Sequence, residues 1–142
     1  MKKIFVILAA MVISLSANAF EFDGISLNAS VNKICSEIAK RGYAYDEKTD
    51  GFTGMCQGTQ IIMKLNYNDV KESGKLGQLI VEVPMSEKNA LEIVTKMLNV
   101  IYHVAEGGKE NLYSVSNDGT TLEVMPYENG IRLVYNTPFY KK

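Results

Sequence analysis

The sequence is poor in the residues that most often carry chemistry. It has no tryptophan, and its 142 residues include one histidine, two cysteines and three prolines. A single histidine excludes a histidine cluster, and together with two cysteines it falls short of the four ligands of a structural zinc site. Glycine-rich phosphate loops and Cys-x-x-Cys pairs are also missing. We therefore predict no cofactor, no metal and no enzymatic activity, with an enzyme of unrecognised site kept as an alternative.

An excess of charge of either sign is also missing. The chain has 15 lysines and arginines against 16 aspartates and glutamates, a formal net charge of −1. Nucleic-acid-binding domains normally carry a basic surplus, so we predict no nucleic-acid partner. With 46% hydrophobic and 22% charged residues, the composition is that of an ordinary folded domain.

The main apolar run lies at the start of the chain. Lys2 and Lys3 are followed by the apolar stretch Ile4–Leu15 and by Ala17-Asn18-Ala19, which is the order found in a signal peptide. We predict cleavage after Ala19, so that residues 20–142 form a single periplasmic or secreted domain. The run is shorter than the ~20 residues that span a bilayer, so we predict no stable membrane insertion.

A first helix is predicted directly after Ser30, which is a typical N-cap residue. Apolar residues then recur at helical spacing and end at Lys40-Arg41-Gly42, where cations and a glycine favour a helix end. The apolar positions are Val31, Ile34, Cys35, Ile38 and Ala39.

A second helix is predicted from Ser86 to about Ala105, before Gly107-Gly108. Its apolar residues cover an arc wider than the usual stripe of a surface helix. The remaining narrow strip is polar and holds Glu92, Lys96, Asn99 and His103. We therefore predict that His103 is dispensable, because surface substitutions usually change stability by no more than about 0.5 kcal/mol.

The other segments alternate between apolar and polar residues, as strands do. We expect strands at residues 43–47, 52–56, 61–67, 79–83, 112–116, 122–127 and 131–135. Asp50-Gly51, Asp118-Gly119 and Asn129-Gly130 separate consecutive runs and favour hairpins. The order predicts an α+β fold, with an antiparallel sheet of about six to seven strands and two helices packed on one face. The chain also divides into two halves, each a helix followed by strands.

The two cysteines are predicted to form a disulfide, because the chain is predicted to be exported. Cys35 lies on the apolar side of the first helix, and Cys56 lies at the end of a strand. A bridge between them would close a loop of about 20 residues and contribute about 3 kcal/mol on the chain-entropy model.

One resemblance can be stated. The segment Phe22-Asp23-Gly24-Ile25-Ser26-Leu27, followed by a short helix ending in Lys40-Arg41-Gly42-Tyr43, resembles the opening of many small secreted bacterial proteins of uncharacterised function. The helix-plus-strands repeat is similar to the architecture of the β-lactamase inhibitor protein and of small outer-membrane assembly lipoproteins. The resemblance implies protein binding, and it transfers no functional residue.

One face of the predicted sheet is the candidate binding site. If the strictly apolar alternate positions face the helices, the opposite face mixes aromatic, methionine and charged residues, a composition that protein interfaces favour. The candidate partner-binding residues are Lys64, Glu82, Glu123, Met125, Tyr127 and Arg132. We predict a protein-binding module of the inhibitor, immunity or envelope-accessory type, whose partner is another protein in the cell envelope or outside the cell. Two alternatives are a sheet face that is merely solvated and a carrier that holds an apolar ligand between helix and sheet.

Overall fold

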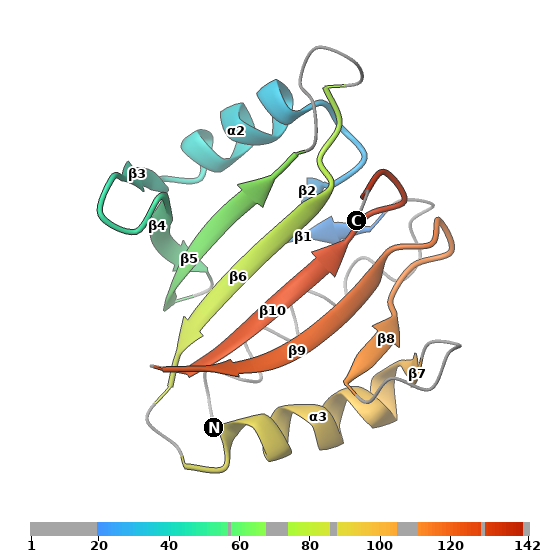
Figure 1. Ribbon diagram of the computed structural model, residues 1–142. Helices are drawn as coiled ribbons and strands as arrows, with labels where there is room; N and C mark the ends of the chain where they lie inside the picture. The colour runs from blue at the N-terminus through green and yellow to red at the C-terminus, as the bar shows by residue number, and fades with distance from the viewer. Residues whose placement is uncertain are drawn as a thin grey trace.

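The computed structural model describes residues 20–56, 58–67, 74–85, 88–104, 111–128 and 130–140. The predicted signal peptide and its cleavage site at Ala19 lie outside these residues. Within them the chain forms an α+β fold with two helices, a two-stranded sheet and an eight-stranded antiparallel sheet (Figure 1). The α+β class and the antiparallel sheet predicted from the sequence are therefore confirmed.

The large sheet has the strand order β3-β4-β5-β6-β10-β9-β8-β7. Its strands are β3 (Ala44–Asp46), β4 (Gly51–Cys56), β5 (Thr59–Asn66), β6 (Gln78–Pro84), β7 (His103–Val104), β8 (Leu112–Ser114), β9 (Thr121–Tyr127) and β10 (Gly130–Asn136). Seven of these strands match the runs predicted from alternation, and the short β7 is the additional one. The centre of the sheet is the pair β6 and β10, in which Val81 lies opposite Leu133.

Alternation along the central strands separates two faces of the sheet. We call the positions that are at most 2% exposed the core face: Ile61, Met63, Leu79, Val81, Val83, Leu122, Val124, Ile131, Leu133 and Tyr135. Successive side chains of a strand point to opposite sides, so the positions between these belong to the other face.

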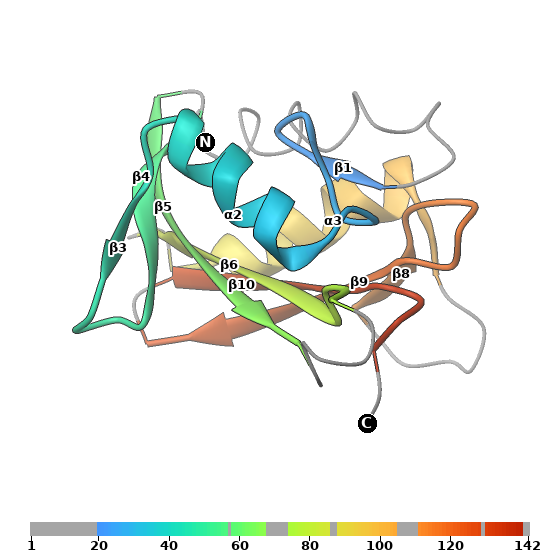
Figure 2. The same cartoon turned by 90° about the horizontal axis from the view of Figure 1, so that it is seen from above.

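The helix α2 (Val31–Lys40) begins and ends as predicted. The Ser30 side chain accepts a hydrogen bond from the backbone N–H of Lys33 at 3.2 Å and caps the first turn. The buried residues of α2 are Val31, Ile34 and Ile38. Figure 2 shows α2 in front of α3, with β6, β10 and β9 running below them.

The helix α3 (Ala90–Ile101) is shorter than the sequence predicts. It begins after Asn89, and at Tyr102 the backbone becomes extended (φ −120°, ψ 159°). His103 therefore lies in β7, opposite Ser114, and the prediction that it belongs to a polar helical strip is wrong. The wide apolar arc is also wrong at Val100, which is 87% exposed. The alternation of apolar and polar residues at 102–104 is compatible with a strand as well as with a helix. The segment forms a strand because it pairs with β8.

A hairpin that the sequence analysis missed precedes α2. Strands β1 (Glu21–Phe22) and β2 (Ile25–Ser26) pair through a two-residue turn at Asp23 and Gly24, whose φ angles are 50° and 79°. Two successive positive φ values define the tight turn that Asp-Gly favours. The hairpin contributes fully buried side chains to the core, because Phe20 and Phe22 both contact the ring of Tyr135 with centroid distances of 4.9 and 5.7 Å.

Candidate functional site

The side of the central strands opposite the core face is charged, and we call it the charged face. It consists of Ile62, Lys64, Ile80, Glu82, Arg132, Val134, Glu123, Met125 and Tyr127. The register joins them in rows across β5, β6, β10 and β9: Ile62–Glu82–Arg132–Met125 and Lys64–Ile80–Val134–Glu123. The structure thus brings all six predicted partner-binding residues onto one surface.

Glu82 is the centre of the charged face. Its side chain is only 7% exposed, and both Nε and Nη2 of Arg132 donate hydrogen bonds to its Oε2, at 2.9 and 2.6 Å. The ammonium of Lys64 lies 3.5 Å from Oε1. A buried carboxylate is stable only when it is paired, so these two cations are what allow Glu82 to be buried.

Arg132 is also fixed from the other side. Its guanidinium lies over the ring of Tyr127, 5.4 Å from the ring centroid, within the range of a cation–π contact. With Glu82 on one side and Tyr127 on the other, the guanidinium keeps a defined orientation although its side chain is 37% exposed. The charged face is therefore organised before any partner binds.

A row of amides closes one end of this surface. Asn66 Nδ2 donates a hydrogen bond to Gln78 Oε1 at 2.8 Å, and Gln78 Nε2 donates one to Asn136 Oδ1 at 2.7 Å. The three side-chain amides therefore form a continuous hydrogen-bonded row across β5, β6 and β10. Asn136 then donates to Thr121 on β9 at 3.4 Å. These polar side chains hydrogen-bond to one another and form the next row along the strands after Lys64–Ile80–Val134–Glu123.

Two open grooves border α2. The larger, of about 530 Å³, lies between α2 and strands β3 to β5. Its lining residues are Val31, Asn32, Cys35, Tyr45, Asp50, Gly51, Phe52, Met63, Leu65, Asn66 and Tyr67. No local pattern in the sequence indicates this groove, because its walls come from segments that are distant along the chain.

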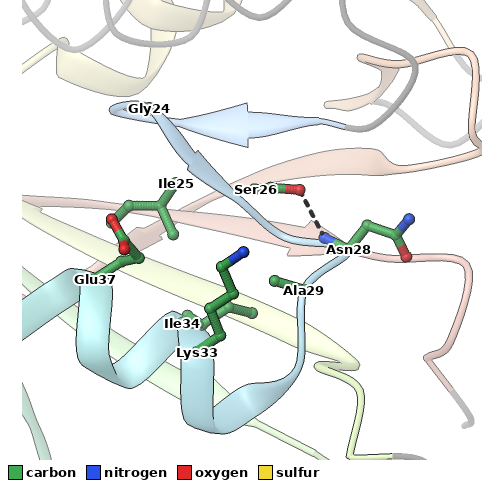
Figure 3. A pocket seen from close by; sticks show the side chains of 8 residues that line it. All are labelled: Gly24, Ile25, Ser26, Asn28, Ala29, Lys33, Ile34 and Glu37. Carbon is green, nitrogen blue, oxygen red and sulfur yellow. Dashed lines mark hydrogen bonds between the residues drawn. The ribbon is translucent and has the colours of Figure 1, made fainter.

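The smaller groove, of about 440 Å³, lies between α2 and the β1–β2 hairpin, and Figure 3 shows its lining residues. Its one carboxylate, Glu37, pairs with Arg41 at 2.8 Å and with Lys40 at 3.6 Å. Arg41 also donates to the backbone oxygen of Asp23 at 3.1 Å, so it holds the hairpin against the helix. The pKa of Glu37 is lowered, first by the hydrogen bond from Arg41. These charges serve local ion pairs rather than a binding site.

The interior holds a polar cluster that the sequence analysis also missed. The hydroxyls of Tyr43, Tyr102 and Tyr135 are buried and have no hydrogen-bond partner among the residues that the structure describes. Burial raises the pKa of Tyr102 to about 12, and burial together with the nearby charge of Asp23 raises the pKa of the Cys56 thiol to about 11. The thiol therefore stays protonated at neutral pH, which makes it a poor nucleophile.

The predicted disulfide is wrong, because Cys35 and Cys56 are both free in the structure. Cys35 lines the larger groove with Phe52 and Leu65, near the start of β4, whereas Cys56 is the last residue of that strand. The four residue-to-residue steps from Phe52 to Cys56 span about 13 Å at the usual rise of a strand. Disulfide formation needs Cα atoms within about 7 Å. The sequence predicts that α2 packs against the sheet, but it does not indicate at which point along β4 Cys35 lies.

Two further properties concern ligands and membranes. Among the residues that the structure describes, no group of three histidine, cysteine, aspartate or glutamate side chains is arranged to hold a metal ion. Within the same residues no helix is long and apolar enough to cross a membrane.

Comparison with known proteins gives no relative. No family model, no curated protein and no solved structure matches the chain.

Proposed function

We propose that this chain is an exported binding module of the inhibitor, immunity or envelope-accessory type, which recognises another protein through the charged face. The observation that carries the proposal is the group formed by Lys64, Glu82, Arg132 and Tyr127. It combines a buried carboxylate, two partly exposed cations and an aromatic ring on rigid central strands. Aromatic and arginine side chains held in this way are the residues that most often dominate binding energy at protein interfaces.

The proposal includes the arrangement of the whole domain. Both helices pack on the core face, which leaves the charged face uncovered by the described elements. The strand order supports two halves, α2 with β3 to β6 and α3 with β7 to β10, because the order is the same from each edge to the central pair. The resemblance to the β-lactamase inhibitor protein is compatible with this arrangement and stays a prediction.

The chemistry of the face indicates what the partner carries. Lys64 and Arg132 are each about one-third exposed while Glu82 between them is buried, so the accessible charge around Glu82 is positive; Glu123, the second carboxylate of the face, lies on β9 at the far end of the Lys64 row. Ile62, Ile80 and Met125 lie beside them on the same face. We therefore propose a folded protein partner that presents an acidic side chain next to an apolar patch, because that surface matches the cations and the apolar groups together.

The alternatives have less support. The two open grooves have mixed polar and apolar linings, whereas a carrier of apolar ligands needs a deep apolar cavity. Catalysis needs polar groups that converge beside a nucleophile or a general base. The interior thiol and hydroxyls have raised pKa values, which do not suit either role.

Site-specific crosslinking tests the proposal in the native cell envelope. A photoreactive phenylalanine replaces Met125 on the charged face, and in a second variant it replaces Val100, the exposed apolar residue of α3. We expect a discrete adduct from position 125 and none from position 100. The additional change Lys64→Gln removes one cation of the face and keeps both Arg132–Glu82 hydrogen bonds, and we expect it to weaken the adduct.

Three outcomes contradict the proposal. The first is an adduct from position 100 alone, and the second is an adduct from position 125 that Lys64→Gln leaves unchanged. The third is the absence of any adduct from position 125 in cells that export the folded protein.

A further inference from the structure

The larger groove between α2 and β3 to β5 has a composition that the proposed function does not use. Its floor continues a row of the core face: Tyr45 on β3 lies opposite Phe52 on β4, and Phe52 lies opposite Met63 on β5. Its wall is the side of α2 that carries Cys35. Its volume of about 530 Å³ is within the range of small-molecule sites.

Aromatic rings in this groove are unusually exposed. Tyr45 and Tyr67 are 54% and 44% exposed, although both line a concave surface. The rings of Tyr45 and Phe52 meet edge to face, with centroids 5.6 Å apart and an interplanar angle of 65°. This contact fixes the orientation of the Tyr45 ring, and Tyr67 forms part of the same lining. The groove thus presents aromatic surfaces to whatever enters it.

The charge of the groove is negative. Among its described lining residues, Asp50 is the one ionisable carboxylate and no residue is basic. The Tyr45 hydroxyl donates a hydrogen bond to Asp50, which holds the carboxylate at the rim. This hydrogen bond is the first cause of the raised pKa of Tyr45, and the charges of Asp50, Glu47 and Asp46 raise it further. Lys48 is the one basic residue of the 46–50 turn.

We propose that this groove binds the alkylammonium group of a small organic cation, against the rings of Tyr45, Phe52 and Tyr67 and beside the carboxylate of Asp50. Aromatic faces attract cations, and quaternary ammonium groups are commonly recognised by several rings together. A hard metal ion would need several oxygen ligands, whereas the lining supplies a single carboxylate. The site is independent of the charged face, since it lies at the other side of β5.

The test uses choline and its uncharged isostere 3,3-dimethyl-1-butanol as probes. Two-dimensional NMR of the ¹⁵N-labelled protein detects the binding of each probe. The two probes have nearly the same shape, so the difference between them measures the contribution of the charge. We expect choline to shift the amide resonances of residues 45, 50 and 67 in a saturable way. We expect the isostere to bind about tenfold more weakly, from the sum of several exposed cation–π contacts.

Variants then locate the contacts. Tyr67→Leu removes one ring and should weaken choline binding about two- to fivefold, the effect of a single exposed cation–π contact. Asp50→Asn removes the negative charge, and asparagine tolerates the backbone conformation at this position, where φ is 52°. This variant should bind choline more weakly, and its affinity should depend less on salt concentration. Tyr127→Leu is the matched control, because it removes a tyrosine from the charged face and should leave choline binding unchanged.

The proposal is overturned if choline shifts no resonance of the groove at concentrations up to about 100 mM, well above a millimolar dissociation constant. It is also overturned if choline and the isostere bind equally well, or if Tyr127→Leu weakens binding as much as Tyr67→Leu. Because none of these probes involves the partner protein, the result is independent of the crosslinking experiment.

Discussion

The ion pair between Arg132 and Glu82 gives the sharpest test of how the charged face is organised. Breaking a fully buried ion pair costs about 3–5 kcal/mol, because it leaves a buried charge without compensation. Here Glu82 is 7% exposed but Arg132 is 37% exposed, so water screens one partner. Lys64 also remains 3.5 Å from the carboxylate. We therefore expect a coupling energy of about 2 kcal/mol between Arg132 and Glu82, below the value for full burial.

The chain contains a matched control for this measurement. Glu92 and Lys96 on α3 form an ion pair at 3.0 Å, a distance similar to those of the Arg132–Glu82 contacts. Their side chains are 62% and 73% exposed. Exposed pairs at this helical spacing couple by about 0.3–0.5 kcal/mol. The two pairs therefore differ mainly in burial and in the number of hydrogen bonds.

Two double-mutant cycles measured by urea unfolding compare the pairs. The first combines Arg132→Met with Glu82→Gln, and the second combines Lys96→Met with Glu92→Gln. We expect coupling of about 2 kcal/mol in the first cycle and at most about 0.5 kcal/mol in the second. Equal couplings below about 0.5 kcal/mol in both cycles would refute the reasoning that the central ion pair holds the charged face rigid.

Three further predictions concern the interior. Gly54→Ala should lower the free energy of unfolding by about 1–3 kcal/mol in urea, because a Cβ there would lie 2.3 Å from the ring of Tyr43; an unchanged stability would contradict this packing. Under native conditions a thiol reagent should modify the partly exposed Cys35, whereas the fully buried Cys56 should react only after unfolding; a disulfide in mass analysis would contradict the free thiols. The free energy of unfolding should fall as pH rises from about 9 to 12, because the folded pKa values of Cys56 and Tyr102 are raised to about 11 and about 12, so the folded state retains protons that the unfolded chain releases. Tyr102→Phe should reduce this fall, and a stability independent of pH in that range would exclude the mechanism.

Much of the fold follows from patterns that are local in the sequence. The period-2 runs predict the central strands, and the Ser30 cap and the Lys40-Arg41-Gly42 end predict α2, because each of these signals acts within a few residues. The six candidate residues of the charged face share one surface for the same reason. Their alternation with apolar neighbours is visible in the chain, and a sheet preserves it.

The errors come from features that depend on distant contacts. His103 was assigned to a helix because apolar periodicity alone cannot tell where a helix gives way to a strand that pairs with β8. The disulfide prediction is wrong because tertiary packing decides which part of β4 lies beside Cys35, and no local pattern in the sequence reports it. The Asp23-Gly24 pair, with apolar Phe22 and Ile25 on either side, is by contrast a local hairpin signal in the sequence. The buried ion pair of Glu82 gave no sequence signal beyond the alternation itself.

The affinity of Tyr127→Ala for the protein captured through position 125 tests the central claim most directly. Tyr127 lies on the charged face, and it is not part of the Arg132–Glu82 hydrogen bonds, so its loss should change binding more than folding. We predict that Tyr127→Ala weakens binding at least about fivefold, or about 1 kcal/mol, as expected for an aromatic interface residue. Lys96→Ala, on the exposed side of α3, should bind as the unmodified protein does. Unchanged affinity for Tyr127→Ala together with a loss for Lys96→Ala would contradict the claim that the charged face is the binding surface.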